Sequence, residues 1–247
     1  TMSQQLHFLQ NKDLGYNHDQ LVVIPYLEEK SFIADMFESG KALRQRILTE
    51  LGSESGVQDI GVSTNALGTP GWVKLGYTDA QSRQFRQFTT TAIDPHFLPL
   101  MQISLVEGHN FTGADATDAN SVIVNEAFAK EFNVALGQPL PQPFDQFRVT
   151  GVAKDFNFES LHEQIHPLVM TTNIRGMFMA ATDVSFDDFP NPKLTFKLGA
   201  GQIASTMSRI EKIWKDLVPD QAFQYSFMDD SIDRQYRTER RLGQIVT

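Results

Sequence analysis

The sequence carries the same order of elements, strand, helix and strand, near each of its two ends. In each unit a short β-branched or aromatic run precedes apolar residues at helical spacing, and a second strand-like run follows. We expect these elements at residues 21–26, 31–51 and 57–63 in the first unit and at 193–198, 203–217 and 222–228 in the second. Two such units form a ferredoxin-like split βαβ sheet, with four strands covered on one face by two helices.

Residues that flank these runs support the assignment. Gly52 follows the first expected helix and Pro219 follows the second, and both residue types commonly end helices. In residues 193–198 leucine and phenylalanine alternate with lysine and threonine, which predicts a half-buried strand with a basic outer face. Residues 1–20 predict a short helix that leads into a turn at Gly15.

The middle of the chain, residues 64–192, is rich in glycine and proline and contains short strand-like runs. The expected strands are Trp72–Tyr77, Phe85–Ile93, Val122–Asn125 and Phe147–Val152, a helix is expected at Glu126–Phe132 with Asn125 as its N-cap, and Gly176–Pro192 is expected to be a long irregular loop. We therefore predict an α+β fold. Residues 1–64 and 191–247 form the ferredoxin-like lobe, and residues 65–190 form an inserted β-rich lobe.

Charge and composition narrow the classes of function. The 247 residues carry 21 basic and 30 acidic side chains, a net charge of −9, so binding to nucleic acid is not expected. The absence of cysteine excludes disulfides, a thiolate nucleophile and cysteine metal sites. No run reaches the roughly 18–20 apolar residues that span a bilayer.

One motif matches a known catalytic signature. His162, Glu163 and His166 fit the HExxH pattern of zinc proteases, in which both histidines lie on one helix face. Pro167 follows directly and disfavours a helical conformation at His166, so we predict a loop here. A metal-dependent hydrolase that uses these three residues is the alternative.

Other catalytic signatures are absent from the sequence. It contains no GxSxG elbow, P-loop or GxGxxG motif, and Asp183, Asp187 and Asp188 lack the spacing of a calcium loop. We therefore assign no catalytic, cofactor-binding or metal-binding residue and expect a protein that is not an enzyme. A ligand-binding sensor module tethered to a membrane protein is a further alternative.

The last expected helix runs from Asp229 to about Val246 and begins with acidic residues, which suit the helix dipole. Its spacing predicts i, i+4 ion pairs between Asp230 and Arg234 and between Asp233 and Arg237. The same helix holds the chain's basic cluster, Arg234, Arg237, Arg240 and Arg241. A solvated helix face explains this cluster, and an approach to lipid headgroups is the alternative.

A series of short motifs between residues 93 and 162 resembles the extracytoplasmic domain of MacB/FtsX-type ABC transporter permeases. In order along the chain these motifs are Ile93–Leu98, Leu105–Phe111, Val122–Ala129, Leu136–Leu140 and Val149–His162. Lys12–Tyr16 is similar to the segment after the family's first membrane helix, and Phe227–Arg240 to the segment before its second. His109 departs from the family, which usually has arginine there.

This resemblance implies a periplasmic domain in two lobes, a porter lobe made from both ends and an inserted sabre lobe. Both ends lead to membrane helices in the parent protein, on the periplasmic face of a bacterial inner membrane. The implied partners are a second permease copy, identical or different, a cytoplasmic ABC ATPase and a periplasmic adaptor, with an unknown cargo. The domain would couple ATP hydrolysis in the cytoplasm to conformational change in the periplasm, for export or for mechanotransmission.

Overall fold

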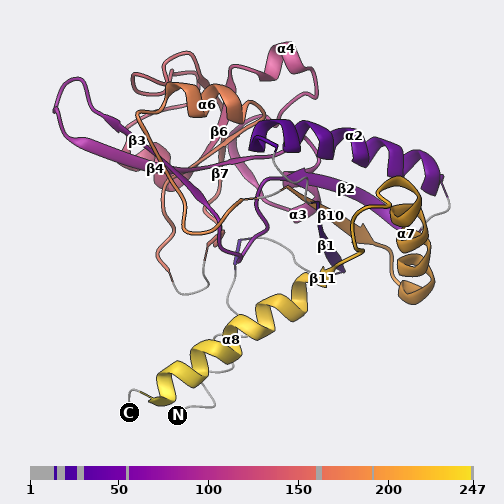
Figure 1. Ribbon diagram of the computed structural model, residues 1–247. Coiled ribbons are helices and arrows are strands. Elements are labelled where there is room, and N and C mark those ends of the chain that lie inside the picture. The colour runs from indigo at the N-terminus through magenta and orange to yellow at the C-terminus, as the bar shows by residue number, and fades with distance from the viewer. Residues whose placement is uncertain are drawn as a thin grey trace.

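Two β-sheets organise the protein, as the computed structural model shows (Figure 1). The structure describes residues 14–15, 20–26, 31–53, 56–159, 163–190 and 192–245. Most of the segment 1–20, in which we expected a short helix, therefore lies outside the described residues. The combination of helices with two largely antiparallel sheets confirms the predicted α+β class.

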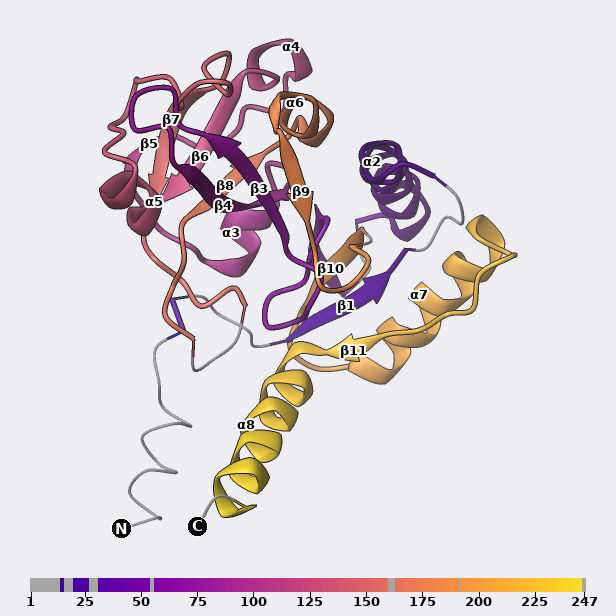
Figure 2. The same ribbon diagram turned by 60° about the vertical axis from the view of Figure 1, so that its left-hand side comes forward.

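The smaller sheet has four strands in the order β11-β1-β10-β2. Its strands are β1 (Leu21–Pro25), β2 (Val57–Ser63), β10 (Lys193–Leu198) and β11 (Ser226–Phe227). β10, from the second unit, lies between the two strands of the first unit and is antiparallel to both. Helices α2 (Ile33–Leu51) and α7 (Ile203–Leu217) pack together on one face (Figure 2). Both predicted helices are confirmed, and α2 ends at Gly52, whose φ is 69°.

The last strand of this sheet is much shorter than predicted. We expected residues 222–228, but β11 contains two residues. The preceding aromatic side chains pack on one another and on helix α7 instead of extending the strand. The ring of Phe223 lies 6.1 Å from that of Trp214 and 5.4 Å from that of Tyr225. The alternating aromatic residues in the segment 222–228 therefore reflect the packing of their side chains and not a longer hydrogen-bonded strand.

The larger sheet has seven strands in the order β5-β7-β6-β8-β4-β3-β9. Its strands are β3 (Val73–Thr78), β4 (Phe85–Ala92), β5 (Leu105–Gly108), β6 (Ser121–Asn125), β7 (Arg148–Ala153), β8 (Leu168–Thr171) and β9 (Asp183–Ser185), and the segment also holds helices α3 (Phe97–Met101), α4 (Asp115–Asp118), α5 (Glu126–Glu131) and α6 (Ile174–Ala180). The four predicted strands are confirmed within one or two residues. Asn125 caps α5 as predicted, because its side chain accepts a hydrogen bond from the Phe128 amide.

The segment 176–192 is not the long irregular loop that we predicted. Helix α6 occupies its start, capped by Asn173, whose side chain accepts a hydrogen bond from the Gly176 amide at 3.0 Å. Strand β9 follows and pairs with β3 at the edge of the larger sheet. All three side chains of β9 are exposed, so no alternation of apolar residues marked this strand in the sequence.

One hydrophobic core joins the two sheets. Alternate residues of β1 point to opposite faces: Val22 and Ile24 pack under α2 and α7, whereas Leu21 and Val23 face the larger sheet. The hydrophobic cluster that contains Leu21 and Val23 also includes residues of α3, of β6, β7 and β8, and of the last helix. We call this cluster the shared core. The far face of the larger sheet has its own core, rich in phenylalanine. The small sheet is therefore buried on both faces.

The last helix, α8 (Met228–Ile245), extends away from both sheets (Figures 1 and 2). It follows β11 directly and confirms the predicted helix. None of the helices in the described ranges is both long and apolar enough to cross a membrane. The expected basic outer face of β10 is partly wrong, because Lys193 and Lys197 are half-buried and burial lowers the pKa of Lys193.

Candidate functional site

The segments at both ends of the described chain reach the shared core. Leu14 is only 4% exposed, and its carbonyl oxygen accepts a hydrogen bond from the Asn157 amide at 2.9 Å. Gly15 has a φ of 79°, and an added Cβ would lie 2.7 Å from the carbonyl oxygen of Asp155. The backbone at residues 14–15 therefore passes against residues 155–157 too closely for any other side chain.

Helix α8 is anchored in the same core at its first turns. Met228 and Ile232 are buried there beside Leu21. One turn further on, the side-chain amide of Gln235 donates a hydrogen bond to the carbonyl oxygen of Gly68, in the link between the sheets. We call Leu14–Gly15 and the anchored part of α8 together the terminal junction.

The topology brings both parts of this junction to one end of the small sheet. β1 and β11 are antiparallel neighbours, and Val22 pairs with Phe227. The chain consequently enters β1 and leaves β11 at the same end of the small sheet.

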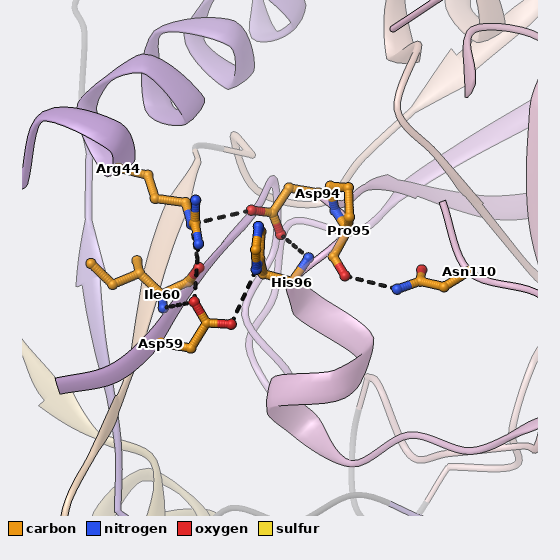
Figure 3. A network of polar contacts seen from close by, with 7 residues as sticks. All are labelled: Arg44, Asp59, Ile60, Asp94, Pro95, His96 and Asn110. Atoms are coloured by element: carbon orange, nitrogen blue, oxygen red, sulfur yellow. Dashed lines mark hydrogen bonds and ion pairs between the residues drawn. The ribbon is translucent and has the colours of Figure 1, made fainter. Parts of the chain in front are cut away.

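A second polar arrangement links helix α2, strand β2 and the turn that follows β4 (Figure 3). Arg44 of α2 donates from Nη2 to Asp59 Oδ1 at 2.9 Å, and its Nε donates to the carbonyl oxygen of Ile60. The same Nε lies 3.7 Å from Asp94 Oδ2. The Arg44 side chain is 12% exposed and that of Asp94 is 3% exposed, so the charges of this pair are largely shielded from water.

His96 completes the network on the side of the larger sheet. Its Nδ1 lies 3.1 Å from Asp59 Oδ2, and its backbone amide donates to Asp94 Oδ1 at 3.2 Å. The carbonyl of Pro95 accepts a hydrogen bond from the Asn110 side chain at 2.8 Å. The network thus connects both sheets through side chains as well as through the shared core (Figure 3).

Burial dominates the electrostatics of Asp94. Removal of its carboxyl group from water raises the pKa above its usual value, although the positive charges of His96 and Arg44 act in the opposite direction. Such a carboxylate depends on its partners to remain charged. We therefore expect Arg44 to be the member whose loss damages the network most.

The sequence analysis did not find this network, although Arg44 carried a signal. It lies four residues after Gly40 and three before Ile47, both of which are buried on the inner face of α2. An arginine on the apolar face of a helix predicts a buried partner. The identity of that partner was not readable, because Asp59 and Asp94 lie 15 and 50 positions away.

A cavity of about 700 Å³ lies beside the terminal junction. Trp72, Phe186 and Arg234 contribute to its walls, which come from the link between the sheets, the segment after β9 and helix α8. Glu159 and Glu163 also line it. The cavity is thus formed where the larger sheet, its link and α8 meet.

The HExxH segment has no helical geometry in its described part. Residues 163–167 form a bend followed by backbone that is neither helix nor strand, which agrees with the predicted loop, while His162 lies outside the described residues. His166 Nδ1 lies 2.9 Å from Glu159 Oε1. The potential ligand atoms of Glu159, Glu163 and His166 all lie within 4.8 Å of one another. The structure thus groups Glu163 and His166 with Glu159, which the motif does not contain.

Two of the acidic residues in the 183–188 segment, Asp187 and Asp188, accept hydrogen bonds from backbone amides. Asp187 Oδ1 accepts a hydrogen bond from the Gly71 amide at 3.2 Å, and Asp188 accepts one from Phe189. In α8 the predicted i, i+4 ion pair of Arg234 does not form, because Arg234 donates instead to Ser231 at 3.3 Å. The side chain of Arg240 lies outside the described part of the helix.

Comparison with known proteins shows which family and which solved structures this chain resembles. Residues 19–206 match the family described as MacB-like periplasmic core domain. The periplasmic region of MacB from Actinobacillus actinomycetemcomitans is similar in structure, with a TM-score of 0.53 and 11% sequence identity over 93% of this chain and 97% of that one. The extracellular domain of the noncanonic ABC-type transporter YknZ from Gram-positive bacteria gives a TM-score of 0.49 and 15% identity over 83% of this chain and 98% of that one. No curated protein sequence matches this chain.

Proposed function

The chain belongs to the family of MacB-like periplasmic core domains, and from this membership we propose that it transmits conformational change in an ABC transporter permease. It is the extracytoplasmic domain of a permease subunit, on the periplasmic face of a bacterial inner membrane. It couples ATP hydrolysis in the cytoplasm to movement in the periplasm and carries out no chemistry of its own.

The observation that carries this proposal is the terminal junction. Leu14 and the α8 residues Met228 and Ile232 all enter the shared core, which also contains residues of both sheets. Close-packed interiors transmit strain, because side chains there have little free volume. A force applied through the two terminal segments therefore moves the small sheet and the larger sheet together.

We also propose that the two lobes have different roles. Residues 1–64 and 191–247 form the porter-like lobe and receive the movement, and residues 65–190 form the sabre-like lobe that contacts a partner. This proposal is supported by the sheets, because β1, β2, β10 and β11 form one sheet and the strands between residues 73 and 185 form the other. The network of Arg44, Asp59 and Asp94 then fixes one lobe on the other.

The partners follow from the same proposal. A second permease, identical or different, pairs with this one, a cytoplasmic ABC ATPase supplies the energy, and a periplasmic adaptor contacts the sabre-like lobe. The charge of −9 is compatible with each of these protein contacts and unfavourable for nucleic acid.

The first test uses the parent gene and its product. We expect one membrane helix directly before this domain and another directly after it, and we expect the full-length protein purified from membranes to retain an ABC ATPase. Flanking segments without membrane helices would overturn the proposal. So would a full-length protein that retains no ATPase even after mild chemical cross-linking in the membrane.

A further inference from the structure

Three potential metal ligands, Glu159, Glu163 and His166, lie together around a small pocket next to the cavity beside α8, and Glu159 and Glu163 line that cavity as well. Their ligand atoms lie within 4.8 Å of one another, and His166 Nδ1 is 2.9 Å from Glu159 Oε1. From this juxtaposition we propose that the protein binds a divalent transition metal ion of the zinc class through these three side chains. This site departs from the expectation, drawn from the sequence, that no metal-binding residue is present.

Hydrogen bonds from outside the cluster hold the backbone at two of the three ligands, His166 and Glu159. The carbonyl of His166 accepts a hydrogen bond at 2.8 Å from the side chain of Asn125, which is fully buried and also accepts one from the Leu168 amide at 3.0 Å. Immediately before Glu159, Phe158 is buried, and its carbonyl accepts a hydrogen bond from the Gly68 amide at 2.9 Å. Because these positions are fixed from outside the cluster, little ordering entropy is lost when an ion binds.

The distances suit a small ion after a modest adjustment. Zinc binds histidine nitrogen and carboxylate oxygen at about 2.0–2.2 Å, which places the ligands of a tetrahedral site about 3.4 Å apart. The pair Glu159–His166 is already closer than that. Glu163 is exposed, so a change of its side-chain rotamer can close the remaining distance.

The ligand types select the ion. Imidazole favours zinc and similar transition metals, whereas calcium and magnesium prefer sites made of oxygen alone. The His166 side chain is 45% exposed and that of Glu159 is 19% exposed, so an ion reaches the site from solvent. Three protein ligands leave one position for water or for a group in the cavity.

This arrangement differs from the zinc-protease motif. That motif requires both histidines on one helix, and residues 163–167 are not helical. Glu159 replaces His162 in our site and lies outside the motif. The bound ion ties Glu159, which lines the cavity beside α8, to the segment at 163–166.

Titration of the purified, chelator-stripped chain with Zn²⁺ by isothermal calorimetry tests the proposal. We expect one ion per chain and at least tenfold weaker binding in both Glu159→Gln and His166→Gln, because even outer-shell substitutions cost about 10–100-fold in metal affinity. His109→Gln is the matched control, since the His109 side chain is exposed and its Nδ1 lies 2.8 Å from the carbonyl oxygen of the adjacent Asn110, outside the proposed site. Ca²⁺ should not compete with Zn²⁺.

The fold of each variant is checked by its thermal unfolding without metal, which should match that of the unmodified chain. Glu163→Gln, an exposed substitution, provides a second test that leaves the backbone contacts of Asn125 intact. Binding that is equal in all the variants and the control would overturn the proposal. It would also be overturned if His162→Gln abolished binding while Glu159→Gln retained it, because the motif would then supply the ligands.

Discussion

Replacing Arg44 by methionine tests the network that joins the two sheets. Methionine keeps most of the apolar length of the side chain on α2 but removes the charge and its donors. The Arg44 Nε lies 3.7 Å from Asp94 Oδ2. At an effective dielectric constant of about 20 this pair is worth about 4 kcal/mol before desolvation is counted. Removal of one partner of a buried pair typically costs about 3–5 kcal/mol, which is the loss we predict in the free energy of unfolding.

The loss should also depend on pH, in a direction that the burial of Asp94 fixes. Burial already raises the pKa of this carboxyl, and loss of Arg44 raises it further. A carboxyl with a higher pKa in the folded state binds its proton more tightly when folded. The stability linked to that proton is complete below the unfolded pKa and is lost as pH rises through the folded pKa. The cost of Arg44→Met should therefore shrink as pH falls from neutral toward the acidic range.

Urea denaturation followed by tryptophan fluorescence measures these changes. Arg46→Met, on the exposed face of the same helix, is the matched control and should change the free energy of unfolding by less than about 0.5 kcal/mol. Adding Asp94→Asn to Arg44→Met should recover about 1–3 kcal/mol, because the two residues interact directly. An equal cost for Arg44→Met and Arg46→Met, or a cost for Arg44→Met that grows at acidic pH, would refute this reasoning.

Four further substitutions test local parts of the fold by the same urea assay. Gly108→Ala should cost about 2–4 kcal/mol, because at a φ of 76° the new Cβ would lie 2.2 Å from the carbonyl oxygen of Thr150. Gly137→Ala, at a φ of 83° with open space around it, should cost only about 1–2 kcal/mol, and equal costs would contradict the clash. Asn125→Ala should cost about 2–4 kcal/mol, since its buried side chain serves three backbone groups. Asp118→Ala removes an acceptor for three donors and should cost about 1–3 kcal/mol. A change below about 0.5 kcal/mol in Asn125→Ala or in Asp118→Ala would show that the hydrogen bonds of that side chain do not stabilise the fold as we expect.

Elements with a sustained local pattern were predictable from the sequence. The stripe of α2, closed by Gly52, and the stripe of α7, closed before Pro219, extend over 19 and 15 residues, long enough for the helical period to be clear. β2 and β10 were likewise found within a residue of their bounds. Asn125 was identified as an N-cap because capping depends only on residues three positions away.

Short elements and long-range contacts were not predictable in the same way. α6 has seven residues and β9 has three exposed ones, too few for a period to appear. Strand β8 begins directly after Pro167, and all four of its residues are buried. The sequence therefore shows no alternation of buried and exposed positions there. The approach of Glu159 to His166 depends on the path of the backbone between them, which no local pattern specifies.

The shared core had no signal in the sequence either. Leu21 and Val23 alternate with Val22 and Ile24 in a strand that is apolar on both faces. Such a run predicts a buried strand but does not show what covers each face. The sequence therefore predicted two lobes, whereas the structure joins them through one core, and our proposal that movement is transmitted depends on this feature.

The most direct test of the account is the distance between two copies of this domain in the reconstituted parent transporter. Met179 of α6 is 81% exposed, and the chain contains no cysteine, so Met179→Cys provides a unique position in the domain for a spin label. A second label at Arg46→Cys gives a distance within one domain, which should not change. We predict that the Met179–Met179 distance distribution shifts between the nucleotide-free and ATP-trapped states. An unchanged distribution in a transporter that still hydrolyses ATP would contradict the proposal that this domain transmits movement.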